Sequence, residues 1–109
     1  MNAKLTMVVL ACFLVPASLA PAQALLSDSA YLTEAASAMT RMMAAMQISP
    51  TGDADRDFVA GMVPHHQGAV DMAEAELKFG KNVALQRIAQ EIIVTQRDEI
   101  VAMRRALQP

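Results

Sequence analysis

Residues 83–107, VALQRIAQEIIVTQRDEIVAMRRAL, decide the fold class, because their apolar residues recur at spacings of three and four. That spacing gathers one apolar stripe on one side of an α-helix, made of Leu85, Ile88, Ala89, Ile92, Ile93, Ile100, Met103 and Leu107. Asn82 is a residue type that caps helices, so the pattern predicts a helix from there to about Leu107. Gln96 interrupts the stripe, and we expect its amide either to bond to another helix or to reach water at the stripe's edge.

Two further helices are predicted upstream of this segment. The first runs from about Ser29 to Met46 and is rich in alanine, with three candidate N-cap residues, Ser27, Asp28 and Ser29. A loop follows at Ser49–Gly52, and the carboxylates within 53–55 suit the start of a second helix that runs to Phe79. Gly80 stands where a left-handed residue often ends a helix. Since no strand pattern is present, we expect an all-α domain of three helices.

The N-terminus looks like a secretory signal peptide. Lys4 supplies its positive charge, an apolar run follows from Leu5 to Val15, and Ala22–Ala24 is a small-x-small cleavage pattern. The run is about 11 residues long, whereas a bilayer span needs about 20. We expect cleavage after Ala24. Cleavage after Ala20 is the second choice, because proline would then follow the cut. The alternative is an uncleaved anchor. The prediction is a signal peptide over 1–24, a single His-His and Met-rich helical domain over 25–109, a periplasmic or secreted location, and no membrane association after cleavage.

The composition of residues 25–109 narrows the classes of partner. The one cysteine, Cys12, lies in the predicted signal, so the exported domain would contain no thiol and no disulfide. Without Lys4 the formal net charge of −2 becomes −3, and this mild acidity argues against nucleic acid or an anionic membrane as partner. Because so short a domain is near the lower limit of independent stability, pairing of two copies is a reasonable expectation.

Four methionines form a stripe on the first predicted helix. Met39, Met42, Met43 and Met46 occupy positions i, i+3, i+4 and i+7, within an arc of about 100°. Such a stripe is often flexible core packing or an adaptable surface for a partner. Thioethers are also soft ligands for Cu(I), and a domain without thiols has no softer donor. Few leucines or isoleucines accompany these methionines, which favours the copper interpretation.

The segment Met62–Met72, MVPHHQGAVDM, gathers two histidines and two methionines on one side of the second helix. Because adjacent side chains diverge by about 100°, His65 and His66 are poorly placed to hold one ion together. Met62 with either histidine, and His65 with Met72, are the pairs compatible with mixed nitrogen and sulfur ligation. That donor set suits copper better than magnesium, calcium or manganese. The alternative is structural, with both histidines hydrogen-bonded in or beside the core.

Proline and glycine shape the same segment. Pro64 cannot donate to the carbonyl of Ala60, so we expect the helix to kink there or to begin afresh at Pro64. Gly61 and Gly68 carry no side chain, so we expect another helix to approach closely at both. Either geometry would turn the histidines toward a site.

The segment from Met62 to Ala73 resembles the bacterial exported family called domain of unknown function 305 (DUF305), which includes CopM-like copper metallochaperones. Further matching residues are Asp57, Phe58, Gly80, Ile92, Ile93, Gln96, Glu99, Ile100 and Met103, and the resemblance covers about residues 53–107. It implies a ferritin-like, up-and-down helical bundle, with copper held by His65, His66, Met62, Met72 and Met103. This chain is a single short copy with three predicted helices. The sequence leaves open whether it closes a four-helix arrangement alone or as a homodimer.

The expected function is a periplasmic protein that binds copper for buffering, transfer or resistance. It would hold Cu(I), or Cu(II) as well, exchange the ion with a periplasmic donor or acceptor protein, and catalyse no reaction. Gln96, Glu99 and Asp57 are expected to support the imidazoles by hydrogen bonds. A di-iron oxidase is disfavoured because no glutamate stands three residues before either histidine. Two further functions are compatible with the sequence, namely a copper-dependent oxidase and a non-metal interaction module with a Met-rich docking face.

Overall fold

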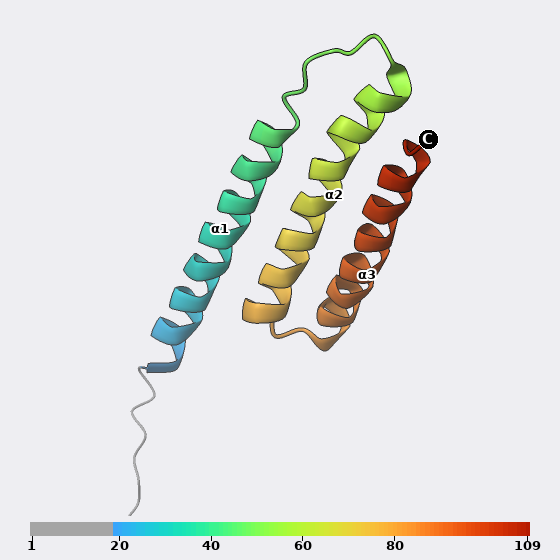
Figure 1. Ribbon diagram of the computed structural model, residues 1–109. Coiled ribbons are helices and arrows are strands. Elements are labelled where there is room, and N and C mark those ends of the chain that lie inside the picture. Colours follow the sequence, from blue (N-terminus) through green and yellow to red (C-terminus); the bar gives the residue numbers. More distant parts are fainter. Residues whose placement is uncertain (1–18) are drawn as a thin grey trace, which may run out of the picture.

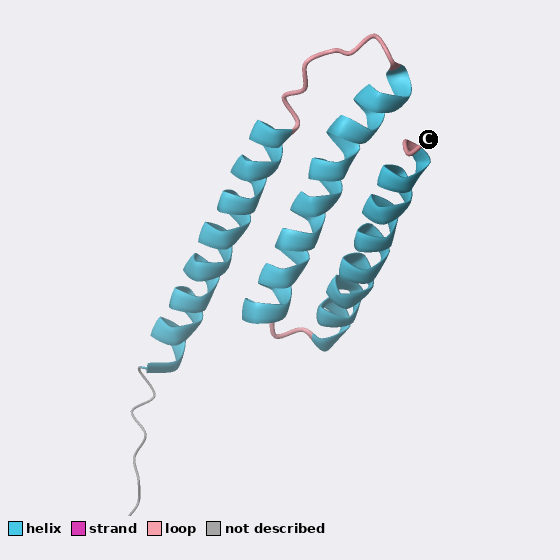
Figure 2. Ribbon diagram, in the orientation of Figure 1, coloured by secondary structure: helices cyan, strands magenta, loops and turns pink. Residues whose placement is uncertain are grey.

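A computed structural model describes residues 19–109, which form three α-helices and, over that range, no strand (Figures 1 and 2). Helix α1 spans Leu19–Ala45, α2 spans Ala54–Phe79 and α3 spans Val83–Ala106. The predicted all-α fold with three helices is therefore confirmed.

The starts of α2 and α3 follow the predicted capping residues. The Asp53 carboxylate accepts hydrogen bonds from the backbone N–H groups of Asp55 and Arg56, in the first turn of α2. Asn82 serves α3 in the same way, accepting from the backbone of Ala84 and Leu85. Each cap satisfies N–H groups that have no partner inside the helix.

Helix α1 begins earlier than the sequence predicts. It is already helical at Leu19, about ten residues before Ser29. Ser27 does not cap it, because its hydroxyl donates to the carbonyl of Ala24 inside the helix. Nothing between 19 and 28 stops a helix, since Pro21 lies in the first described turn, where proline is tolerated. The predicted cleavage after Ala24 falls within this helix, and most of the predicted signal, residues 1–18, lies outside the described residues.

The prediction for Gly80 is wrong, and one of the two alternatives for Pro64 is excluded. Gly80 has φ −68° and ψ 154°, an extended conformation and not a left-handed one. It is constrained instead by crowding, because a Cβ there would lie 2.6 Å from the carbonyl oxygen of Glu76. Pro64 does not start a new helix either, since α2 continues through it without interruption.

The three helices lie side by side in one layer. Helix α2 is central, with α1 and α3 antiparallel to it on opposite sides (Figure 1). Within the described residues, no Cα atom of α1 comes within 8 Å of a Cα atom of α3. Domains usually bury their apolar residues between two packed layers, and this layer has no second one.

The core is correspondingly thin. Among the residues whose burial the structure describes, 21–109, the buried apolar ones are Ala38, Val70, Ala73, Ala75, Ala89 and Ile100, so only a valine and an isoleucine there exceed alanine in size. The predicted stripe of α3 is only partly covered, because Ala89 and Ile100 are buried whereas Leu85 and Ile88 are each 50% exposed. One neighbouring helix cannot cover the whole stripe. No helix within residues 19–109 has both the length and the apolar content to span a membrane.

Candidate functional site

One side of the layer, which we call the ionic face, carries ion pairs between the helices. Arg41 of α1 lies 3.0 Å from Asp71 of α2, and Lys78 of α2 pairs with Glu34 of α1. A further pair joins α2 to α3, with 2.6 Å between Arg97 and Glu74. The α2 members of these pairs, at positions 71, 74 and 78, recur at spacings of three and four and so share one side of that helix.

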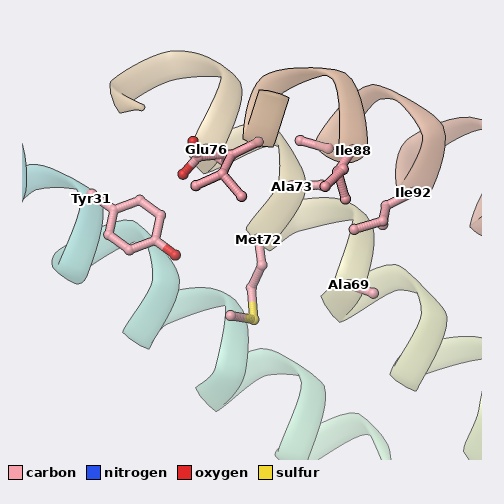
Figure 3. A pocket seen from close by; sticks show the side chains of 9 residues that line it. Tyr31, Ala69, Met72, Ala73, Glu76, Ile88 and Ile92 are labelled. Atoms are coloured by element: carbon pink, nitrogen blue, oxygen red, sulfur yellow. The ribbon is translucent and has the colours of Figure 1, made fainter. Parts of the chain in front are cut away.

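The opposite side of the layer is an apolar groove between α1 and α3, with α2 as its floor. We call this side the groove face. The groove is lined by Tyr31 of α1, by Ala69, Met72, Ala73 and Glu76 of α2, and by Leu85, Ile88, Ala89 and Ile92 of α3. Figure 3 shows Tyr31, Met72 and Ile92 reaching toward it from three different helices. Met62 and His65 continue the α2 part of this face at helical spacing toward the start of α2.

His66 is the buried polar side chain among the described residues, and both of its ring nitrogens are occupied. Nδ1 lies 2.8 Å from the carbonyl oxygen of Met62, and Nε2 lies 2.8 Å from Oε2 of Glu99 on α3. A carbonyl only accepts, so Nδ1–H donates to it. The carboxylate of Glu99 engages the other ring nitrogen. In this arrangement both nitrogens of His66 are occupied by oxygen partners, so neither is open to a metal.

The expected supports of the imidazoles are found only in part. Glu99 does bond an imidazole, as predicted. Asp57 instead accepts from the backbone N–H and the hydroxyl of Thr51, which ties the loop before α2 to its first turn. Gln96 is half-buried.

His65 is exposed, unlike its neighbour. The centroids of the two imidazole rings are 5.8 Å apart, and the rings meet edge-on at 64°. The His66 ring contacts Glu99 of α3, whereas His65 is exposed, in line with the divergence of about 100° between adjacent helical residues. His65 is therefore the histidine whose nitrogens remain accessible to a ligand.

The register between α2 and α3 places Met62 opposite Met103. Because α2 and α3 are antiparallel and His66 faces Glu99, one turn back along α2 and one turn forward along α3 bring the two methionines to the same level. Both methionines are half-buried, and the exposed His65 stands three residues after Met62 on α2.

The methionines of α1 divide into two groups. Met39, Met43 and Met46 are exposed, whereas Met42 is half-buried and packs on Gly68 of α2. A Cβ at Gly68 would lie 2.8 Å from Cγ of Met42, which confirms the predicted close approach there. The same prediction for Gly61 is wrong, because no neighbouring heavy atom lies within 4 Å of a Cβ built there.

A metal site made of histidine, cysteine and carboxylate side chains alone is not found among residues 19–109. Within that range no three side chains of the types His, Cys, Asp and Glu lie where they could hold one metal ion. The sequence interpretation did not predict the apolar groove. The small residues Ala69 and Ala73 beside Met72 are the pattern that indicates an open apolar surface on α2 there.

The fold and the site define a small all-α domain whose open face presents soft donors beside an apolar groove. The chain belongs to the family described as "Domain of unknown function (DUF305)", whose model matches residues 20–107. It is also similar to "Uncharacterized protein L153" of Acanthamoeba polyphaga mimivirus, with 33% identity over 49 residues. That match covers 45% of this chain and 32% of the viral protein, so the chain matches about a third of that relative's length. Neither description names a ligand.

Proposed function

We propose that this protein binds copper, with Cu(I) as the principal form, and holds or transfers the ion without catalysing a reaction. Three features support the proposal: the exposed imidazole of His65, the thioether of Met62 one turn before it on α2, and the register that puts Met103 of α3 opposite Met62. Thioethers select Cu(I) among the common biological metals, and imidazole binds copper in either oxidation state.

The neighbouring residues have distinct roles in this proposal. The bond between His66 and Glu99 fixes α2 against α3, and it thereby keeps Met62 level with Met103. Met72 stands seven residues beyond His65, about 10 Å along the helix, and is available as a further thioether from the groove. Met42 is occupied in packing on Gly68 and does not belong to the proposed ligand set.

Export is a second part of the proposal. Lys4, the apolar run from Leu5 to Val15 and the Ala22–Ala24 pattern support a signal peptide. The copper would then be received from, or passed to, another protein outside the cytoplasm. Expression of the full-length chain in a bacterium, followed by an intact-mass measurement on the periplasmic fraction, tests this. A mass corresponding to residues 25–109 is expected, and an unprocessed chain retained in the cytoplasm would contradict export.

Copper uptake is tested by anaerobic titration with Cu(I) in competition with a coloured Cu(I) chelator. We expect stoichiometric uptake by the wild type. His65→Ala, Met62→Leu and Met103→Leu should each weaken the affinity by at least about tenfold, which corresponds to about 1.4 kcal/mol. Met42→Leu is the matched control, because the same substitution removes a thioether that the proposal leaves unused. No uptake by the wild type, or an unchanged affinity in His65→Ala, would overturn the proposal.

The exposed thioethers of α1 favour a second candidate function, in which Met39, Met43 and Met46 form an adaptable contact surface for an amphipathic partner helix. The triple Met→Leu variant distinguishes the two functions in the same titration. Loss of a copper equivalent would assign these residues to metal binding. Unchanged stoichiometry would leave them to partner contact.

A further inference from the structure

We propose that a second copy of this chain covers the groove face, so that two three-helix layers pack into one bundle about a two-fold axis. The starting observation is the open layer itself. Within residues 19–109 no Cα atom of α1 lies within 8 Å of one of α3, and the apolar residues Leu85 and Ile88 in the groove between them remain half exposed. Phe58, four residues before Met62 on the same side of α2, extends this apolar surface and is also exposed.

The area of the groove face matches what a stable dimer needs. Helix α2 has 26 residues and is therefore about 39 Å long. With neighbouring helices packed about 9 Å away on each side, the axes of α1 and α3 lie about 18 Å apart. The face then measures roughly 700 Å². Specific interfaces of ordinary size bury about 800 Å² per partner, so one such face can support one copy.

The chemistry of the two faces indicates which one is covered. The ionic face carries Arg41–Asp71, Lys78–Glu34 and Arg97–Glu74, whose charges would lose hydration on burial. The groove lining contains no lysine or arginine and one carboxylate, Glu76. Such a surface offers no charges that could complement a strongly charged partner. A second copy of the same apolar face does complement it.

A two-fold interface is isologous, so residues near the axis meet the same residues of the partner. The middle of α2 on the groove face is occupied by His65 and Ala69. An axis through the centre of the face would therefore bring the His65 regions of the two copies together. This consequence rests on the proposed copper function, and it predicts that copper tightens the dimer.

The dimer is tested first without copper. Full-length protein is expressed, recovered as the host delivers it, treated with chelator and examined by sedimentation velocity over a wide concentration range. Tyr31 is the single tyrosine in a chain without tryptophan, and it lines the groove, so its fluorescence should change on dilution as the groove opens to water. A wild type that stays monomeric at all concentrations would overturn the proposal, whether or not it binds copper.

The face is tested with a matched pair of variants on α3. Ile88→Glu places a charge in the groove, and Val94→Glu places the same charge on a 62% exposed residue outside the groove lining. We expect Ile88→Glu to weaken dimerisation by at least tenfold and Val94→Glu to leave it unchanged, with equal helicity by circular dichroism. Equal effects of the two variants would refute the assignment of the face. If Ile88→Glu loses helicity, Leu85→Gln replaces it, and the Tyr31 dilution series on wild-type protein stands independently of both.

The copper consequence has its own measurement. Adding Cu(I) to the wild type should shift the monomer–dimer equilibrium toward the dimer, and Ile88→Glu should bind copper more weakly than Val94→Glu. A dimer that forms in chelator and does not respond to copper would refute the placement of His65 at the axis while leaving the dimer itself intact.

Discussion

Replacing Glu99 by alanine is the sharpest test of how α2 and α3 are held together. The change removes the carboxylate that lies 2.8 Å from Nε2 of His66 and leaves a buried ring nitrogen without its partner. Hydrogen bonds to charged groups contribute about 1.5–3 kcal/mol, and an unsatisfied buried group costs about 1–3 kcal/mol. Because the Glu99 side chain is 50% exposed, solvent weakens the pair. We therefore expect a loss of about 1–2 kcal/mol in the free energy of unfolding.

The assay is urea unfolding followed by circular dichroism, at one fixed protein concentration and with metal removed. Glu74→Ala is the matched control, since it breaks the ion pair with Arg97, in which both side chains are more than half exposed. Such pairs contribute at most about 1 kcal/mol. Glu99→Gln, which keeps an acceptor oxygen, should lose less than Glu99→Ala. A double-mutant cycle with His66→Ala should return a coupling of about 1 kcal/mol. Equal losses in Glu99→Ala and Glu74→Ala would refute the reasoning.

Four further substitutions test the helices by the same unfolding measurement. Gly61→Ala should stabilise the protein by up to about 1 kcal/mol through helix propensity, because the new Cβ meets no heavy atom within 4 Å. Gly68→Ala should be less stable than Gly61→Ala by about 1–3 kcal/mol through overpacking, because its Cβ would lie 2.8 Å from Cγ of Met42. Pro64→Ala should stabilise α2 by up to about 3 kcal/mol, because it restores a donor for the carbonyl of Ala60; an unchanged midpoint would contradict this. Asn82→Ala should cost about 1 kcal/mol by removing the cap of α3, and a loss within error would assign those N–H groups to water.

The local features of the fold were predictable because they depend on neighbours in sequence. Caps at Asp53 and Asn82 require only a suitable side chain before a helical pattern, and both were confirmed. The divergence of His65 and His66 follows from helix geometry alone. The start of α1 was missed because no residue between 19 and 28 opposes a helix. The predicted capping residues at 27–29 therefore lie inside α1 and not at its beginning. Gly80 was misinterpreted because its constraint comes from the crowding of Glu76 and not from its own dihedral angles.

The candidate site was predictable only as far as residue type and helix face. The spacing of Met62, His65 and Met72 places them on one side of α2, and of the three it is Met72 that lines the groove. The sequence does not reveal that Glu99 bonds Nε2 of His66, because that contact joins residues 33 positions apart and depends on the register between α2 and α3. Nor does it reveal that Met42 differs from its three neighbours, since the difference arises from a glycine on another helix.

The apolar stripe of α3 connects the fold with the proposed dimer. At about 100° per residue, the stripe from Ile88 to Ile93 spans an arc of about 140° around the helix. Helix α2 covers the part of the arc that holds Ala89 and Ile100, and the edge that holds Ile88 stays half exposed in the groove. A stripe that faced α2 alone would need no isoleucine at that edge. Its width therefore matches a helix with two neighbours, namely α2 inside the chain and, in the proposed dimer, a helix of the second copy that lies over the groove face.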